Sequence, residues 1–482
     1  MRRNAKQSHL RTVVFCAATI AFTMTGGSAR VHAAAEPPVD IGNRIEMFVD
    51  RYLVSEVKGA ATLQLTNPER REVVFTTNKP WEGPSIAYFS VIQNAGVIRL
   101  YYRGYCPEDA DNRQVTCYAE SRDGVNFIRP DLGLYAFDGS AHNNIIWQGI
   151  ESHNFAPFLD TNPAAEPGSG FKALAGINGK LYAFKSGDGI HWTKITETPV
   201  ITDGAFDSLN TAFWDRRGYY RCYSRYWDDH VAPGVRAIQS CTSTDFIHWT
   251  KPVPNQYPEG SPREQFYTNA TRPVPGAEHQ LLSFPKRFVP ERTRRVAYKE
   301  PGVSDAMLMA SRDGVQWDRS FLDAWVRPGQ DEFNWTQRSN MPAAGIVSVD
   351  PDGFSMYISR HYQWPDNGLQ RITIRKYGFG SVHSGRAGGE MITKPFVVRG
   401  SSLVLNMATS AAGAVQVEVQ SEAGAPIDGF KLTDCSPIFG DSLHEQAAWH
   451  GKADLTPLIG KTVRLRFVMS DADLYAIQIA AK

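Results

Sequence analysis

The stretch Ser121-Arg122-Asp123-Gly124-Val125-Asn126-Phe127 decides the fold of this chain, because the chain repeats it. The same Ser-x-Asp-Gly-x-x-aromatic pattern returns at 186–192 and 311–317, and a variant with Phe in place of Gly stands at 243–249. Asp accepts hydrogen bonds from the backbone ahead of it, Gly takes a left-handed conformation, and the aromatic side chain anchors the next strand. Each copy therefore predicts a tight turn between two strands.

The spacing of the four turns indicates a repeat architecture. Their first serines are 65, 57 and 68 residues apart, and a degenerate copy of the pattern follows at 375–379. Short apolar runs fill the intervals, as expected of strands in sheets that are buried on both faces. The sequence therefore predicts an all-β protein whose first domain, residues 45–385, is a five-bladed β-propeller.

The strands of this propeller can be assigned from the apolar runs. The innermost strands are expected near 86–91, 155–159, 211–214, 266–268 and 345–349. A propeller commonly closes its ring by letting a terminal strand complete the last blade, and the run 45–50 (IEMFVD) is the candidate for that strand.

A second domain is expected after the Gly-rich segment 385–390. Residues 391–482 read as alternating short strands, among them 403–406, 415–419, 463–468 and 475–479. No segment with a helical period interrupts them. The pattern predicts a C-terminal β-sandwich.

The first 33 residues have the composition of a signal peptide. A basic stretch precedes the apolar run 12–24, which is too short to span a bilayer, and Val31-His32-Ala33 fits the small-x-small rule for cleavage. We therefore expect a mature chain that is secreted or periplasmic. An uncleaved membrane anchor is the alternative.

Composition limits the partners and cofactors. A formal net charge of +1 gives no reason to expect nucleic acid or an anionic membrane, and a monomer is expected. No cofactor is expected, neither a metal site nor a structural calcium ion is indicated, and no cysteines have the spacing of a zinc site. Two cysteine pairs lie on neighbouring strand-like runs, and disulfides or free buried thiols are both compatible with the sequence: Cys106 with Cys117, and Cys222 with Cys241.

Carboxylates just before the innermost strands are the candidate catalytic residues. The starts of these strands open at one end of a propeller channel, so Asp207, Glu264 and Glu82 are expected to converge there. Cleavage of a glycosidic bond needs two carboxyl groups that flank the bond. The structural alternatives are a turn cap for Asp207 and a salt bridge with Arg263 for Glu264.

Further polar and aromatic residues at the same end are candidate substrate-binding residues. Trp81 would stack on a sugar ring, and the others would bind hydroxyls or a substrate carboxylate: Asn154, Arg225, Arg338, Asn340, Arg360 and His361. Core packing is the alternative for Trp81, and ion pairs within or between blades are the alternative for the charged residues. The aspartates of the repeated turns are interpreted as structural, because a residue that recurs in every blade is expected to stabilise the blade itself.

The turn pattern, the five groups of strands, the signal peptide and the following sandwich resemble the five-bladed β-propeller glycoside hydrolases, a superfamily that includes families 32, 43, 68 and 117. The domain order is similar to family 32, and the stretch 118–147 resembles uncharacterised secreted bacterial members. The family 32 motifs Trp-Met-Asn-Asp-Pro-Asn-Gly, Arg-Asp-Pro and Glu-Cys do not occur in that form.

The resemblance implies a secreted glycosidase that acts on a carbohydrate substrate. Glu264 would be the general acid, and Asp207 or Glu82 the base or nucleophile. Three alternatives stay open at this point: a non-catalytic, lectin-like propeller; a sialidase-like propeller, although the turn pattern is one residue shorter than the sialidase Asp-box; and a lyase or lactonase.

Overall fold

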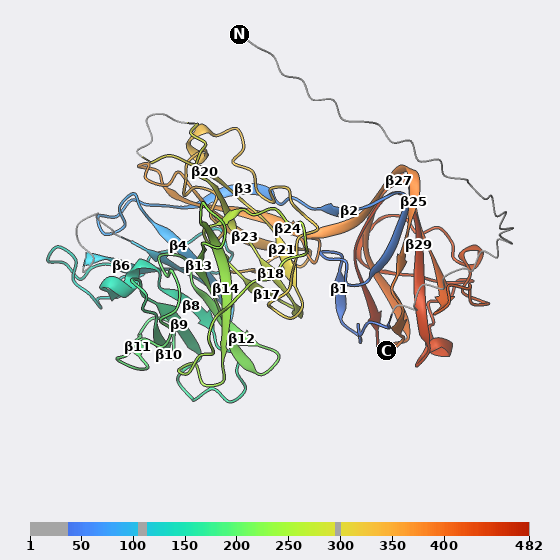
Figure 1. The fold of residues 1–482 in the computed structure, drawn as a ribbon, viewed down its shortest axis with the longest axis horizontal. Helices are drawn as coiled ribbons and strands as arrows, with labels where there is room; N and C mark the ends of the chain where they lie inside the picture. Colours follow the sequence, from blue (N-terminus) through green and yellow to red (C-terminus); the bar gives the residue numbers. More distant parts are fainter. Residues whose placement is uncertain (1–36, 105–112, 295–299, 482) are drawn as a thin grey trace, which may run out of the picture. The chain divides into compact units, whose positions relative to one another are not determined.

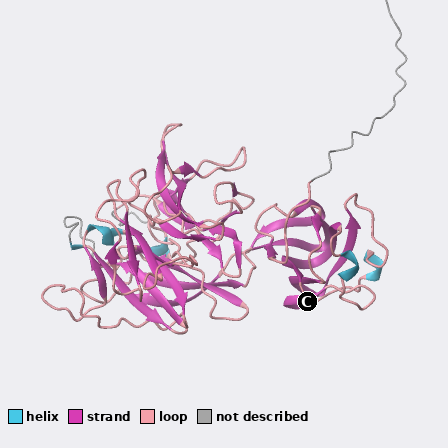
Figure 2. Ribbon diagram, turned by 90° about the horizontal axis from the view of Figure 1, so that it is seen from below, coloured by secondary structure: helices cyan, strands magenta, loops and turns pink. Residues whose placement is uncertain are grey.

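The computed structural model of the protein describes residues 37–104, 113–294 and 300–481. The expected signal peptide and Cys106 lie outside these residues. The described part consists of strands, loops and a few short 3-10 helices, which confirms the all-β prediction (Figure 2). None of the helices in these ranges has the length and apolarity needed to span a bilayer.

Three four-stranded antiparallel sheets follow one another along the chain (Figure 1). The first consists of β4 (Ala87–Asn94), β5 (Val97–Arg103), β6 (Val115–Ser121) and β7 (Ile145–Gln148). The second consists of β8 (Ala156–Leu159), β9 (Phe171–Ala175), β10 (Tyr182–Ser186) and β11 (Thr193–Lys194). The third consists of β12 (Thr211–Asp215), β13 (Tyr219–Asp228), β14 (Val235–Ser243) and β15 (Val253–Pro254).

The fourth group contains two sheets. One consists of β17 (Arg272–Val274), β18 (Ala277–Ser283), β21 (Met309–Ser311) and β22 (Trp317–Asp318), and the other of β16 (Gln265–Phe266), β19 (Lys286–Val289) and β20 (Val303–Ala306). The innermost strand expected at 266–268 is therefore misplaced, because β16 pairs with β19 and it is β17 that pairs with β18.

The fifth group corrects the predicted closing strand. It consists of β23 (Gly353–Arg360), β24 (Gly368–Arg375) and β3 (Glu69–Thr76), with Leu369 opposite Phe75. The prediction that 45–50 completes this sheet is wrong, because β1 (Ile45–Met47) pairs with β29 (Thr462–Ala480) near the C-terminus. The sequence of β3, ERREVVFT, is rich in charge because β3 is an edge strand with several exposed side chains, so it lacks an apolar strand signal.

The repeated turns have the hydrogen bonds that their sequence predicts. In the first turn, Ser121 Oγ accepts from the N–H of Gly124 at 2.9 Å, and Asp123 Oδ1 accepts from the N–H groups of Val125 and Asn126 at 2.9 and 2.8 Å. Gly124 has φ +74°. The same bonds recur in the turns at 186–192, 243–249 and 311–317.

These turns also dock on the neighbouring sheets. The Tyr223 hydroxyl of the third sheet donates to the carbonyl of Gly314 in the fourth at 2.8 Å. The Tyr357 hydroxyl of the last sheet donates in the same way to Gly124 of the first, also at 2.8 Å. The first and last sheets are therefore neighbours.

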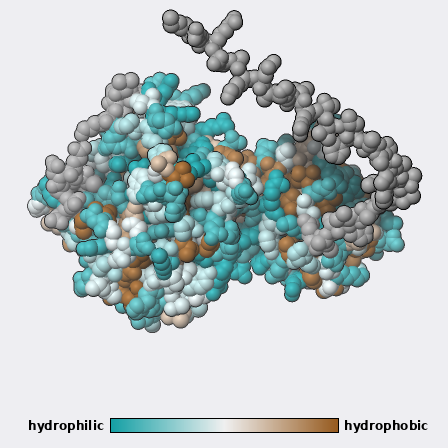
Figure 3. Space-filling view, in the orientation of Figure 1, coloured by the Kyte–Doolittle hydropathy of each residue, from teal (hydrophilic) through white to brown (hydrophobic). Residues whose placement is uncertain are grey.

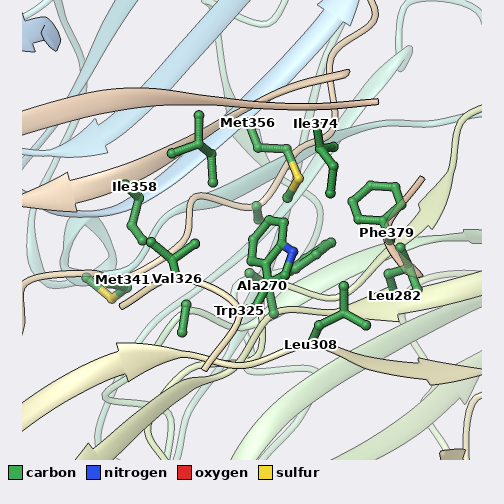
Figure 4. Packing of buried hydrophobic residues seen from close by; sticks show 14 of the residues in the cluster. Ala270, Leu282, Leu308, Trp325, Val326, Met341, Met356, Ile358, Ile374 and Phe379 are labelled. Atoms are coloured by element: carbon green, nitrogen blue, oxygen red, sulfur yellow. The ribbon is translucent and has the colours of Figure 1, made fainter. Parts of the chain in front are cut away.

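The innermost strands are neighbours in the same order. β4 lies beside β8, β8 beside β12, and β12 beside β17. The segment 341–347, which precedes β23, lies beside β4, because the Ala344 N–H donates to the carbonyl of Phe89 at 2.9 Å. Apolar side chains fill the space beneath these strands, with Trp325, Phe379 and Leu282 in one buried cluster (Figure 4).

The C-terminal strands form one seven-stranded sheet. It contains β1, β2 (Val54–Leu65), β25 (Gly380–Thr393), β26 (Phe396–Val397), β27 (Ser402–Ser421), β28 (Asp441–Gln446) and β29. Figure 1 shows β2, in blue, reaching the orange and red strands, and β2 pairs with β25. The short strands expected at 403–406 and 415–419 are the two ends of β27, whose register with β29 shifts between them. The Gly-rich segment 385–390 lies inside β25.

Cys222 and Cys241 lie directly opposite each other on β13 and β14, and both are free, buried thiols. A hydrogen bond between the two thiols, together with burial, raises the pKa of Cys222 well above its ordinary value. On the surface seen in Figure 3, hydrophilic residues predominate and hydrophobic residues are scattered, as is normal for a protein surface.

Candidate functional site

Asp207 lies in the loop before β12 and contacts side chains from β4, from β13 and from the 3-10 helix η2 (Ile150–His153). Its Oδ1 atom is 2.8 Å from His153 Nε2 and accepts from the Tyr88 hydroxyl at 3.3 Å, and its Oδ2 atom is 3.7 Å from Arg225 Nη2. The side chain is 54% exposed, so one part of the carboxylate stays open to a ligand.

The electrostatic environment keeps Asp207 ionised. Burial by itself would raise its pKa, but the hydrogen bond with His153 and the charges of Arg225 and Arg338 outweigh burial and hold the pKa well below 3.8. For His153 the balance is opposite, because burial and the charge of Arg103 lower its pKa below 6.5 despite the neighbouring carboxylate. A negative Asp207 next to a neutral His153 is therefore the state expected at neutral pH.

The loop that carries Asp207 is fixed by buried amides. The Asn154 side chain donates to the carbonyl of Phe206, and its Oδ1 atom accepts from the N–H of Gly176 at 2.8 Å. The Ser208 hydroxyl donates to the carbonyl of Tyr267 at 2.6 Å. Asn154 was predicted to bind substrate, but it is fully buried and serves to position Asp207.

Tyr267 is the centre of a group of cations. Its buried ring has Lys286 Nζ 4.0 Å from the centroid, Arg225 Cζ at 5.0 Å, Arg236 Cζ at 5.6 Å and Arg338 Cζ at 5.9 Å. We call these four side chains the cation cluster. Together with Asp207, they give this end of the sheets a net positive charge.

Tyrosine hydroxyls connect the cation cluster to Asp207. The Tyr88 hydroxyl lies 3.2 Å from that of Tyr267, and burial raises the pKa of Tyr88 well above 10. Tyr88 has φ +55° at a register shift in β4, and a bulky residue adopts such a conformation only where the surrounding structure enforces it.

Tyr362 accepts hydrogen bonds from two guanidinium groups. Arg103 Nη2 and Arg338 Nη1 donate to its hydroxyl oxygen at 3.2 and 3.0 Å. Arg103 also places Nη1 3.3 Å from His153 Nε2, so it links Tyr362 to the Asp207 pair. Because these two donors occupy both lone pairs of the Tyr362 oxygen, its O–H is left to donate to a third group.

The structure does not bring Glu82 to this site. Glu82 is fully buried, accepts from the Tyr102 hydroxyl at 2.7 Å and pairs with Arg129 at 2.6 Å. It also accepts from the backbone N–H groups of Asn78 and Lys79. A carboxylate enclosed in this way holds a loop in place. Trp81 beside it is half-buried, and its indole N–H donates to Asn144 at 2.7 Å, which agrees with the packing alternative.

Glu264 directly precedes β16 and points away from the cation cluster. It pairs with Arg287 at 2.9 Å and with Arg319 at 2.5 Å, rather than with Arg263, and lines a cavity of about 650 Å³. Its neighbour Gln265 faces the cluster and accepts from Arg236 at 2.6 Å. Successive side chains of an extended chain point to opposite faces, so Gln265 contacts the cation cluster and Glu264 does not.

Three other predicted residues lie outside the cluster. Asn340 is buried and donates to the carbonyls of Ser304 and Asn334 at 3.0 and 2.9 Å. His361 lies between two carboxylates, with Asp366 2.7 Å from Nδ1 and Asp331 2.6 Å from Nε2, and Arg360 pairs with the same Asp331 at 3.2 Å. Within the described ranges, no group of three or more His, Cys, Asp or Glu side chains could hold a metal ion.

Of the predicted residues, Asp207, Arg225 and Arg338 meet in the site. His153, which lies just before an innermost strand, was expected at this end as well. The residues that sequence reasoning left out of the site are Tyr88, Arg103, Arg236, Tyr267, Lys286 and Tyr362. One signal was available, since aromatic-x-cation occurs in or just after three second strands, as Tyr101-x-Arg103, Tyr223-x-Arg225 and Phe284-x-Lys286.

The far ends of the innermost strands surround a different, apolar cavity of about 620 Å³. Phe158, Phe213, Pro273 and Ile346 are among the residues that line it. It shares no lining residue with the Asp207 site.

No protein-family model matches this sequence, and no curated protein does. Some solved structures have a distant likeness to this chain. A glycoside hydrolase has 11% identity and a TM-score of 0.43, covering 64% of this chain and 92% of that one. An N-acetylgalactosamine deacetylase from F. plautii has 14% identity and a TM-score of 0.42, covering 65% and 95%. An α-L-arabinanase from Penicillium chrysogenum has 12% identity and a TM-score of 0.40, covering 64% and 99%. Likeness at this level establishes neither a family nor an activity for this chain.

Proposed function

We propose that this protein is an exported enzyme that cleaves a glycosidic bond at one end of a five-bladed β-propeller channel, and that a β-sandwich follows the propeller. The blade count is supported by the docking of the first turn on the last sheet. It is also supported by the site itself, to which all five groups of strands contribute. The composition of residues 1–33 supports export.

The observation that carries the proposed activity is the state of Asp207. It is ionised, rigidly placed and more than half exposed, as a base or nucleophile at a sugar ring must be. In hydrolysis, the bond from the anomeric carbon to the leaving oxygen breaks. The anomeric carbon gains the oxygen of water, and the leaving oxygen gains a proton.

We assign the proton donor to Tyr362 in place of Glu264. Its oxygen accepts from two guanidinium groups, which stabilise negative charge on that oxygen after the proton has left. Arg103 holds it next to the pair formed by His153 and Asp207. Glu264 and Glu82 keep structural roles in this proposal.

A second candidate reaction is favoured by the cation cluster. In β-elimination, a base removes the proton next to a sugar carboxylate, and the bond to the neighbouring glycosidic oxygen breaks to leave a carbon–carbon double bond. Cations around the carboxylate stabilise the charge that develops there. In that reaction, His153, which is neutral, would be the base.

A glycan panel that compares the wild type with Asp207→Asn and Glu264→Gln tests the proposal. We expect Asp207→Asn to lower kcat by about 10²- to 10⁴-fold, and Glu264→Gln to retain activity. Hydrolysis in isotopically labelled water labels the new reducing end, whereas elimination yields an unsaturated, ultraviolet-absorbing product without the label.

Unfolding curves of both variants serve as the control for folding. Undiminished cleavage by a well-folded Asp207→Asn variant would exclude Asp207 from the chemistry. A wild type that binds glycans but cleaves none would indicate a lectin.

A further inference from the structure

The cation cluster around Tyr267 contains buried positive charge that the described residues do not balance. Lys286 is fully buried, and its ammonium group donates to the carbonyl of Gln337 at 2.5 Å. The carboxylate nearest to Arg225 is Asp207, at 3.7 Å, and Arg338 is 4.0 Å from Glu300. Within the described residues, Lys286 and Arg236 have no ion-pair partner.

Four other cations that are buried or partly buried are paired with carboxylates. The residues concerned have a carboxylate at 3.1 Å or closer: Arg129 with Glu82, Lys172 with Asp160, Arg221 with Asp215, and Arg312 with Glu46. Removing a charge from water without a partner is costly, and contact with an aromatic ring returns only a small part of that cost. Arg272 is also buried without a carboxylate, and among the described residues its guanidinium group donates only to backbone carbonyls. The cluster differs from this single case, because four cations surround one aromatic ring.

The unmatched guanidinium groups also carry unused hydrogen-bond donors. Arg225 is only 6% exposed, and its Nε and Nη1 atoms have no acceptor among the described residues. The Nε atoms of Arg236 and Arg338 are buried without an acceptor as well. Guanidinium groups present paired N–H donors in a fixed plane, which matches the oxygens of a carboxylate, sulfate or phosphate.

We propose that the cation cluster of Arg225, Arg236, Lys286 and Arg338 binds an oxyanion that the glycan itself carries, a carboxylate or a sulfate group on the sugar next to the bond that is cleaved. The assignment of this oxyanion to the sugar rests on the proposed function. Asp207 is adjacent to Arg225, so an anion held by Arg225 places its sugar ring beside the reactive carboxylate. The substrate class is therefore an acidic glycan. A neutral glycan would leave the buried cations unpaired.

Calorimetric titration at low ionic strength tests the site without any turnover. The ligands are glucuronate, its neutral counterpart glucose, glucose 6-sulfate and inorganic phosphate. We expect glucuronate or glucose 6-sulfate to bind while glucose does not. Added salt should weaken binding, because it screens the charges.

Two variants and a matched control locate the site. Arg225→Gln and Arg338→Gln should each weaken anion binding tenfold or more. Arg287→Gln removes an arginine from the opposite face of β19 and should leave the affinity unchanged. Arg338 is partly exposed, so its variant keeps the test valid if Arg225→Gln does not fold.

The outcomes separate the two proposals. If the protein bound anions but cleaved no glycan, the proposed enzymatic activity would be refuted and the proposed oxyanion site would stand. If the protein cleaved neutral glycans but bound no anion, the proposed activity would stand and the proposed oxyanion site would be overturned. If inorganic phosphate alone bound, the site would bind a free oxyanion and not a group on the glycan. Equal affinity for glucose and glucuronate would overturn the inference.

Discussion

The two faces of β19 use positive charge in opposite ways. On one face Arg287 pairs with Asp305 and Glu264, at 2.7 and 2.9 Å, and each guanidinium–carboxylate contact is complete within the protein. On the other face Lys286 lies fully buried against Tyr267, with three arginines near the same ring. The two cationic side chains are adjacent in sequence and point to opposite faces of the strand.

This difference separates a structural ion pair from a binding site. Matched charges stabilise the native state and need no ligand, so their removal should change stability and leave activity intact. Unmatched charges destabilise the native state, and a protein that retains them gains something else from them. The same distinction holds for the two carboxylates Glu82 and Asp207, of which one is enclosed by partners and the other is half exposed.

The largest effect is expected where a matched charge is fully buried. Glu82→Gln leaves Arg129 without its carboxylate partner in a site that excludes water. We expect a loss of about 3–5 kcal/mol in the free energy of unfolding, measured by chemical denaturation at neutral pH.

Asp207→Asn is the matched control, because its side chain is exposed and its loop is held by buried amides. The interactions that lower the pKa of Asp207 also stabilise the folded state at neutral pH, so we expect this variant to lose some stability, but less than Glu82→Gln. Equal stability of the two variants would remove the distinction between Glu82 and Asp207.

The second prediction is a gain in the free energy of unfolding. Lys286→Met removes a buried charge and keeps most of the volume, and replacements of this kind often stabilise by about 1–4 kcal/mol. Burial, together with the charges of Arg338 and Arg236, lowers the pKa of Lys286 well below 10.5 in the folded state. The folded protein therefore binds fewer protons than the unfolded chain, so the wild type loses stability as the pH falls below 10.5.

The advantage of Lys286→Met should accordingly grow as the pH is lowered, until Lys286 is protonated in both states. Unfolding curves at a series of pH values measure it. A variant that is less stable than the wild type at every pH would show that Lys286 is matched after all.

Much of the architecture could be predicted from the sequence, because the four turns depend on local chemistry. A serine, an aspartate and a left-handed residue close each turn with hydrogen bonds to the neighbouring backbone, so the turn can be recognised from the sequence alone. The closing strand could not be predicted in this way. β3 is an edge strand with a charged sequence, whereas the apolar run 45–50 fits several buried positions equally well, and only long-range pairing decides between them.

The candidate site was predicted in part for a related reason. Asp207 precedes β12 and Arg225 lies within β13, two strands whose positions the turns had set. The choice of Glu264 was wrong by one position, because neighbouring side chains point to opposite faces and it is Gln265, the first residue of β16, that faces the cation cluster. Tyr267 carries no local signal of function, and the aromatic-x-cation pattern that contains Lys286 is a weak one, since an aromatic or a lysine beside a strand is ordinarily a packing or surface residue. Their role emerges only when four cations meet at one ring.

The smallest effect is expected on the matched, partly exposed face of β19. Arg287→Met removes the partner of Asp305 and Glu264, but the pairs are in contact with solvent, and water takes over part of the interaction. We expect a loss of about 1 kcal/mol in the free energy of unfolding at low salt, and less at high salt. Glycan cleavage and anion affinity should stay at the wild-type level. If Arg287→Met instead weakened anion binding as strongly as Arg338→Gln, the two faces of β19 would belong to one continuous site, and Glu264 would return as a candidate for the second catalytic carboxylate.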